Sequence, residues 1–295
     1  MNKYKIGFFV LLGLLGFTMY ANYDYRVFKA LIAQNYMPKD ALEELYSRHI
    51  AAENRRGFSR DFDRMVIAVV TSELSEISQD QYTYLYAPQE FQASVAADRA
   101  AARTAKFYAL DENTAYLYIP NISRLTRMFV HTNREELAQF SNLVLDLRGN
   151  YGGWLSEFHR IADLFVPNGA VISHEITRHS MLTRAVTSTN DAFFDFDQII
   201  ILQNRNTASA AEGLIMALSE HLPNVTTIGQ TSFGKGTGQV TLPLTGGSAV
   251  RATILQVLGP VRQDIHNVGL APDIEIDIAA DFIAEALAQI QPFSP

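Results

Sequence analysis

The chain has 295 residues, 48% of them hydrophobic, which is enough for one large folded domain or two smaller ones. Its formal net charge of −7 argues against a general binder of nucleic acids or anionic lipids, because such proteins carry an excess of basic residues. The absence of cysteine excludes thiol nucleophiles, disulfides, cysteine-ligated zinc and iron–sulfur clusters.

The seven histidines do not form a His-x-x-x-His pair with an adjacent glutamate, which is the zinc-binding motif of many metalloproteases. His174 and His179 stand near each other in the sequence, and we expect them to be structural or surface residues. The sequence therefore predicts neither a metal ion nor an organic cofactor.

Residues 1–25 are predicted to be a signal peptide or a membrane anchor. Lys3 and Lys5 precede the uncharged apolar run 6–21, which is the pattern of an export signal. The run is shorter than the roughly 20 residues of a spanning helix, but bulky residues stand before Ala21 where a cleavage site needs small ones. We favour an uncleaved signal anchor over a cleaved peptide, and the positive-inside rule places the rest of the chain outside the cytoplasm.

Residues 26–110 form the second predicted segment, an N-terminal helical region with a linker. Apolar residues recur at helical spacing over 41–56 and again over 62–74. The aromatic cluster within 80–91 is predicted to be a packed junction between helices, and the alanine-rich residues 93–105 a solvated helix or linker. No catalytic pattern is present in this segment.

The third segment, residues 111–295, contains the candidate chemistry. A strand is predicted over 114–119, a helix over 132–140 and a strand over 142–147. The last of these is almost continuously apolar, as expected for a strand buried on both faces.

A glycine-rich turn follows the buried strand and precedes a predicted helix over 155–165. The turn contains Gly152 and Gly153, and consecutive glycines let the backbone bend sharply and approach a ligand closely. A turn that opens onto a helix N-terminus can direct backbone N–H groups at an anion, although a plain strand-to-helix turn has the same sequence.

Ser209 lies between a predicted strand over 199–202 and a predicted helix over 211–222. Serine is a common helix N-cap, so this position alone does not identify a nucleophile. The residues around it are small, including Ala208, Ala210 and Gly213, and leave space around the hydroxyl group. We therefore interpret Ser209 as a candidate nucleophile.

Lys235 is the candidate base for Ser209. A predicted strand over 225–229 leads to this lysine, which stands between Gly234 and Gly236. Desolvation favours the neutral amine, which can then accept a proton from a serine hydroxyl. Gln239, shortly after, is placed to orient the amine.

Two other enzyme classes use parts of the same pattern. Residues 229–235 match the P-loop spacing, but Gly236 replaces the Ser or Thr that binds magnesium, and a strand-like run follows instead of a helix. A Ser-His-Asp hydrolase would need a Gly-x-Ser-x-Gly elbow, which Ser209 lacks, although His221 and His266 remain available as bases.

Five blocks together resemble the C-terminal processing, or tail-specific, serine peptidases that use a Ser/Lys dyad. The blocks read Asp-Gln-Tyr-Thr…Pro-Gln-Glu-Phe, Asp-Leu-Arg-x-Asn-x-Gly-Gly, Asn-x-x-Thr-Ala-Ser-Ala-x-Glu, Thr-x-Phe-Gly-Lys-Gly-x-x-Gln and Gly-Leu-x-Pro-Asp-Ile. Their order and spacing resemble that family over roughly residues 40–280. They lie at Asp80–Phe91, Asp146–Gly153, Asn204–Glu212, Thr231–Gln239 and Gly269–Ile274.

The resemblance implies a crotonase-like α/β core built from ββα units. It also implies that Ser209 is the nucleophile, Lys235 the general base and Gln239 the residue that orients the lysine. The oxyanion hole would then use backbone N–H groups of Ala210 and of the turn at Gly152–Gly153.

Two features depart from the family pattern. The spacing from Ser209 to Lys235 is longer by a single residue, which falls at a helix end, where insertions are tolerated. Residues 92–113 are too few to hold the PDZ module that the family usually carries before its core.

The expected function is a serine endopeptidase that cleaves proteins near their C-termini, outside the cytoplasm, either anchored in the cell membrane or secreted. Its partners would be protein or peptide substrates and not nucleic acid. The alternative is a non-catalytic module on the same fold that binds a peptide or an apolar ligand.

Overall fold

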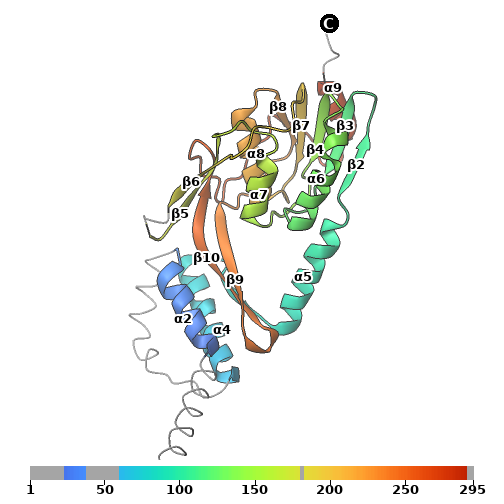
Figure 1. The fold of residues 1–295 in the computed structure, drawn as a ribbon. Helices are drawn as coiled ribbons and strands as arrows, with labels where there is room; N and C mark the ends of the chain where they lie inside the picture. Colours follow the sequence, from blue (N-terminus) through green and yellow to red (C-terminus); the bar gives the residue numbers. More distant parts are fainter. Residues whose placement is uncertain (1–22, 38–59, 180–182, 291–295) are drawn as a thin grey trace, which may run out of the picture. The chain divides into compact units, whose positions relative to one another are not determined.

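The computed structural model describes residues 23–37, 60–179 and 183–290 (Figure 1). These residues form two compact units. The first takes its described residues from Met1–Ser94, Thr177–Ser180 and Gln239–Leu255. The second takes them from Val95–Ile176, Met181–Gly238 and Gln256–Pro295.

Two predicted features of the N-terminal region fall largely or wholly outside the described residues. They are the signal or anchor over 1–25, of which 1–22 are not described, and the helix over 41–56. Among the helices that the structure does describe, none is long and apolar enough to span a membrane.

The first unit packs two helices beside a small antiparallel sheet. Its core consists of apolar side chains from the helices and from the two longer strands, with Tyr36, Ile67, Leu74 and Val250 among the most buried. Asp24 at the start of the first helix accepts hydrogen bonds from the backbone N–H and hydroxyl of Thr245, at 2.8 and 2.6 Å. The elements are α2 (Tyr23–Asn35), α4 (Arg60–Ser78), β1 (Tyr84–Tyr86), β9 (Thr237–Pro243) and β10 (Ala249–Leu258), with a 3₁₀ turn at Thr245–Gly247.

The second unit is organised around a six-stranded sheet in the order β11-β8-β7-β4-β3-β2. All neighbouring strands pair in parallel except β2 and β3, which are antiparallel. The strands are β2 (Lys106–Ala109), β3 (Thr114–Tyr118), β4 (Asn142–Asp146), β7 (Gln198–Gln203), β8 (Val225–Gly229) and β11 (Ile274–Glu275).

The helices of the second unit lie on both faces of this sheet, and strand alternation explains why. Leu143, Leu145 and Ile201 point to one face and pack against α6, α7 and α8, which Figure 1 shows beside one another. Val144 and Ile200 point to the other face and pack against α9. The helices are α6 (Arg124–Leu137), α7 (Leu155–Ala162), α8 (Ala210–His221) and α9 (Phe282–Gln289), and α5 (Pro88–Ala102) precedes β2.

A hairpin of β5 (Val171–Thr177) and β6 (Arg184–Thr187) carries a buried polar cluster. His159 of α7 lies 3.0 Å from Ser173 Oγ and 3.8 Å from the carboxylate of Glu175, which also binds Arg184. Burial lowers the pKa of His159 to about 4, although the carboxylate of Glu175 acts in the opposite direction.

This buried histidine should make the protein less stable in mild acid. The unfolded chain takes up a proton near pH 6.5, whereas folded His159 does so only near pH 4, so the stability present above pH 6.5 is lost as pH falls toward 4. We expect the free energy of unfolding to drop by about 2 kcal/mol between pH 7 and pH 5 from this group. Urea titrations at both pH values measure it, and the drop should be smaller in His159→Gln; an equal drop in both proteins would contradict the prediction.

Candidate active site

Ser209 occupies a sharp turn between β7 and α8. Its backbone has φ 57° and ψ −120°, a region that residues other than glycine rarely adopt. The turn is held by its own backbone N–H, which donates to Glu212 Oε2 at 2.6 Å. A strained residue at a helix N-terminus presents its side chain away from the regular backbone, which suits a reactive group.

The glycine turn after β4 packs directly against this serine. A Cβ added to Gly152 would lie 2.6 Å from the carbonyl oxygen of Ala208 and 2.7 Å from the Cβ of Ser209. A Cβ on Gly153 would lie only 1.9 Å from the carbonyl oxygen of Ile122. Both positions have positive φ, so close approach and backbone conformation together require glycine.

Backbone hydrogen bonds fix the turn in place. Ile122 N–H donates to the Gly152 carbonyl at 2.8 Å, and Trp154 N–H donates to the Ile122 carbonyl at 2.9 Å. The N–H of Gly152 donates to Asn150 Oδ1 at 2.9 Å. The residues on either side of the glycines, Tyr151 and Trp154, are 70% and 69% exposed.

The N–H groups of Gly153 and Ala210 differ from that of Gly152, because neither makes a hydrogen bond to another described residue. Ala210 is the first residue of α8, and the first N–H groups of a helix have no partner within the helix. Of the N–H groups in the predicted oxyanion hole, these two can therefore receive an anion without breaking an existing bond.

Lys235 lies in a glycine loop that packs against residues 264–269. A Cβ on Gly234 would lie 2.7 Å from the N atom of Gly269, and one on Gly236 would lie 3.1 Å from the Cβ of His266. A strand, β9, follows the loop instead of a helix, which confirms the distinction from a P-loop drawn from the sequence.

Ser209, Ala210 and Lys235 line one small cavity of about 10 Å³, close to the space for a single water molecule. Gly213 and Gly236 are the other small residues at its surface, and both lack a side chain that would fill it. The apolar wall consists of Leu155, Phe158, Met216, Val257 and Ile265.

Glu212 joins the serine turn to the lysine loop, although sequence reasoning assigned it no role. Its side chain is fully buried. Oε2 accepts from the N–H groups of Ser209 and Lys235, at 2.6 and 2.9 Å. Oε1 accepts from Ser232 Oγ and the N–H of Gly234, at 2.5 and 2.7 Å. Glutamate three residues after the serine is a capping-box signal, and that spacing could have pointed to Glu212.

Gln239 belongs to β9 in the first unit, whereas Ser209 and Lys235 belong to the second. Its amide nitrogen donates to Thr253 Oγ1 at 3.2 Å, and its amide oxygen accepts from Arg251 Nη2 at 3.3 Å. The structure thus brings Ser209, Ala210, Lys235 and the glycine turn together, and it places Gln239 on the hydrogen-bonded strands of the first unit.

Comparison with known proteins places the chain among peptidases. The model of peptidase family S41 matches residues 113–276. The carboxy-terminal-processing protease of Bartonella bacilliformis is 35% identical over 134 residues, which are 45% of this chain and 30% of that protein. The carboxyl-terminal-processing protease of a Synechocystis strain is 33% identical over 130 residues, which are 44% of this chain and 30% of that protein. The match thus spans about 30% of the length of these curated relatives.

Solved structures show the same fold over most of the chain. A lipoprotein from Streptococcus agalactiae aligns with a TM-score of 0.68 and 17% identity, covering 91% of this chain and 96% of that one. The photosystem II D1 C-terminal processing protease aligns with a TM-score of 0.59 and 18% identity, covering 86% and 92%. The predicted α/β fold class is confirmed. Because the family model also covers more than half of the residues, the chain belongs to peptidase family S41.

Proposed function

We propose that this protein is a serine endopeptidase that cleaves proteins near their C-termini through a Ser209–Lys235 dyad. The observation that carries the proposal is the shared cavity, in which a strained serine and a lysine line the same small apolar space. Membership of family S41 supports a peptidase, and the printed names of the relatives describe carboxy-terminal processing in those proteins.

In the proposed reaction the neutral amine of Lys235 takes the proton of the Ser209 hydroxyl while the oxygen attacks the substrate carbonyl carbon. The resulting oxyanion accepts hydrogen bonds from the N–H groups of Ala210 and Gly153. The protonated lysine then donates its proton to the leaving amine, and an acyl-enzyme on Ser209 remains. Water, deprotonated by the same lysine, releases the acid product and the free serine.

Only one of the two backbone N–H groups in the turn Gly152–Gly153 belongs to the proposed oxyanion hole. Gly152 N–H is engaged by Asn150, so Gly152 serves to bring the turn against Ser209, and Gly153 supplies the donor. Gln239 remains the proposed orienting residue for Lys235 on the strength of the sequence pattern.

The small apolar cavity indicates which residue precedes the cleaved bond. Phe158, Met216 and Ile265 are among the side chains that enclose it, and they offer no charged partner to an incoming side chain. A methyl group, which is about the size of a water molecule, fits without displacing them, so alanine is the expected residue at this position.

We also propose that the protein acts outside the cytoplasm, either anchored or secreted, with residues 1–25 as its signal or anchor, 26–110 as its helical region and 111–295 as its catalytic core. The apolar run after Lys3 and Lys5 supports this location. Among similar proteins, one is a C-terminal processing peptidase named as chloroplastic and another is a bacterial lipoprotein.

The competing function is a non-catalytic binding module for a peptide or an apolar ligand. A binding module has no need of a strained serine beside a lysine. A fluorophosphonate probe distinguishes the two functions, because it forms a covalent adduct with an activated serine. We expect mass spectrometry to find the adduct on Ser209 of the native protein and on no serine after denaturation in urea. Tight peptide binding without any adduct on Ser209 would favour the binding module.

A further inference from the structure

A second, larger cavity lies on the other face of the six-stranded sheet, away from the cavity at Ser209. Its volume is about 460 Å³. It exists because α9 has only eight residues and packs mainly on β7 and β8, so the part of this face over β2 and β3 is left without a covering helix.

Strand pairing brings polar side chains together on the part of this sheet face that no helix covers. In the antiparallel pair of β2 and β3, Lys106 stands opposite Tyr118, and Tyr108 stands opposite Tyr116. Alternation places these four side chains on one face, and all four line the cavity. The rings of Tyr108 and Tyr116 lie 4.7 Å apart, which gives the cavity an aromatic side.

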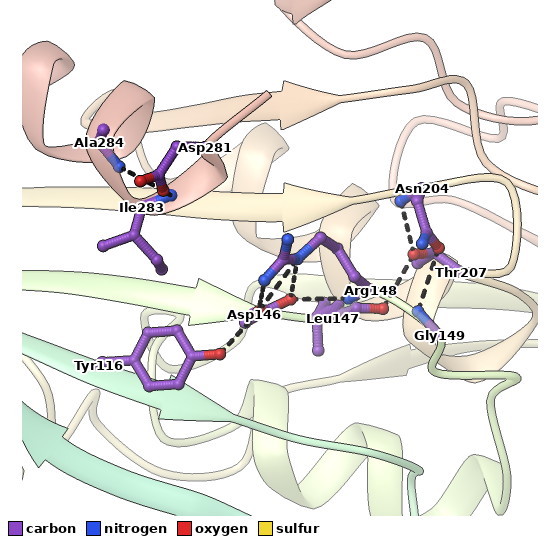
Figure 2. A network of polar contacts seen from close by, with 10 residues as sticks. All are labelled: Tyr116, Asp146, Leu147, Arg148, Gly149, Asn204, Thr207, Asp281, Ile283 and Ala284. Atoms are coloured by element: carbon purple, nitrogen blue, oxygen red, sulfur yellow. Dashed lines mark hydrogen bonds and ion pairs between the residues drawn. The ribbon is translucent and has the colours of Figure 1, made fainter. Parts of the chain in front are cut away.

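An ion pair between Asp146 and Arg148 lines the cavity, and Figure 2 shows its hydrogen bonds. Asp146 is buried and accepts hydrogen bonds from Tyr116 Oη at 2.7 Å and from Arg148 Nε and Nη2 at 2.9 and 2.5 Å. The guanidinium of Arg148 lies over the ring of Phe282, 4.4 Å from its centroid. Asp146 therefore occupies two nitrogens of Arg148, and the third, Nη1, makes no hydrogen bond to another residue that the structure describes.

Further donors around the cavity are also available. Lys106 Nζ and the hydroxyl groups of Tyr108 and Tyr118 make no hydrogen bond or ion pair to another residue in the described part of the chain. Lys106 and Arg148 are two cations beside the single carboxylate of Asp146, which is already bound. An uncompensated positive charge with several hydrogen-bond donors is complementary to a monoanion.

We propose that this cavity binds the free carboxylate at the C-terminus of a polypeptide, with Lys106 and Arg148 as the cationic partners. The aromatic rings of Tyr108 and Phe282 would contact the last side chain. The assignment rests on the proposed function, because a peptidase that acts near C-termini must recognise the chain end, and residues 92–113 leave no room for a separate peptide-binding module.

The test uses the full chain with Ser209→Ala, so that binding is measured without cleavage. The probes are two peptides with the same apolar sequence, labelled with fluorescein at the N-terminus, one ending in a free carboxylate and the other in an amide. Fluorescence anisotropy should show the acid binding at least about tenfold more tightly than the amide, since a charge-assisted hydrogen bond is lost. The difference should shrink as salt is raised.

Two variants test the assigned residues. Adding Lys106→Gln or Tyr118→Phe should weaken binding of the acid and leave binding of the amide unchanged. Arg124→Gln is the matched control, because Arg124 is an exposed cation on α6, the helix on the opposite face of the sheet, and this change should alter neither peptide.

Equal affinity for acid and amide, or equal effects of Lys106→Gln and Arg124→Gln, would overturn the proposal. Displacement of the acid by low millimolar inorganic phosphate would also overturn it and assign the cavity to phosphate. The peptidase proposal fails separately: if the fluorophosphonate adduct on Ser209 is missing while the acid–amide difference persists, the cavity is a tail-binding site on a non-catalytic protein.

Discussion

Replacing Ser209 by alanine should lower the turnover of an unfolded protein substrate by about 10⁴-fold or more, and Lys235→Met should have a similar effect. The reason is that the nucleophile and its base act as a unit, so removal of either stops the covalent step. Release of fluorescent fragments from labelled casein measures turnover. Circular dichroism should show an unchanged fold in both variants.

The double variant provides the sharper test. If Ser209 and Lys235 form one dyad, Ser209→Ala with Lys235→Met should be no slower than either single variant, because the second change removes a group that has already lost its partner. Losses that multiply in the double variant would show that the two residues contribute independently, and the dyad would then be wrong.

Glu212→Gln should lower turnover by about 10²-fold with little change in KM, although Glu212 is not proposed to touch the substrate. Oε2 of Glu212 accepts the backbone N–H groups of Ser209 and Lys235, and Oε1 accepts the backbone N–H of Gly234. The amide group of glutamine must point its own N–H₂ at one of these donors, whichever way it is turned. The backbone donor then moves away, which separates the turn of Ser209 from the loop of Lys235. Misplacement of reacting groups in this way lowers the reaction rate.

A substitution at a second buried carboxylate serves as a control, because it distinguishes an effect on the site from a general loss of stability. Glu175 is 7% exposed, binds Arg184 and does not line the cavity at Ser209, so Glu175→Gln should lower the melting temperature but leave turnover and probe labelling nearly normal. The rate of fluorophosphonate labelling, measured well below the melting temperature of each variant, reads the geometry at Ser209 directly. Wild-type labelling in Glu212→Gln would mean that Glu212 is only a structural residue.

The parallel core of the second unit could be predicted from the sequence because its strands are buried on both faces. Residues 142–147 and 199–202 are nearly continuous apolar runs, and the structure places β4 and β7 there with their residues almost wholly buried. The predicted helix over 211–222 corresponds to α8, which begins at Ala210.

Amphipathic edge elements were harder to predict. The strands β2 and β6 have four residues each, most of them exposed, and β5 combines buried with half-buried residues, so none of the three shows a clear alternation. Helix α6 begins at Arg124 and not near Thr132, because a capping box at Ser123 starts it earlier while Leu125 and Met128 face outward and obscure its apolar stripe.

The residues of the candidate site could be predicted from the sequence, but their arrangement in space could be predicted only in part. Ser209 and Lys235 stand out locally by their small neighbours and flanking glycines. The hydrogen bonds that Glu212 accepts from Ser232, Gly234 and Lys235 depend on tertiary contacts with the lysine loop, 20 to 23 residues further along the chain. No local pattern encodes such contacts.

The position of Trp154 has a consequence for spectroscopy. It is the single tryptophan of the chain, it is 69% exposed, and its backbone is fixed directly after the glycine turn that packs against Ser209. All tryptophan emission from the native protein therefore arises at the residue that follows this glycine turn. A polypeptide seated over the turn would shield the indole from water and shift its emission to shorter wavelength, so occupancy of the site could be followed without a label.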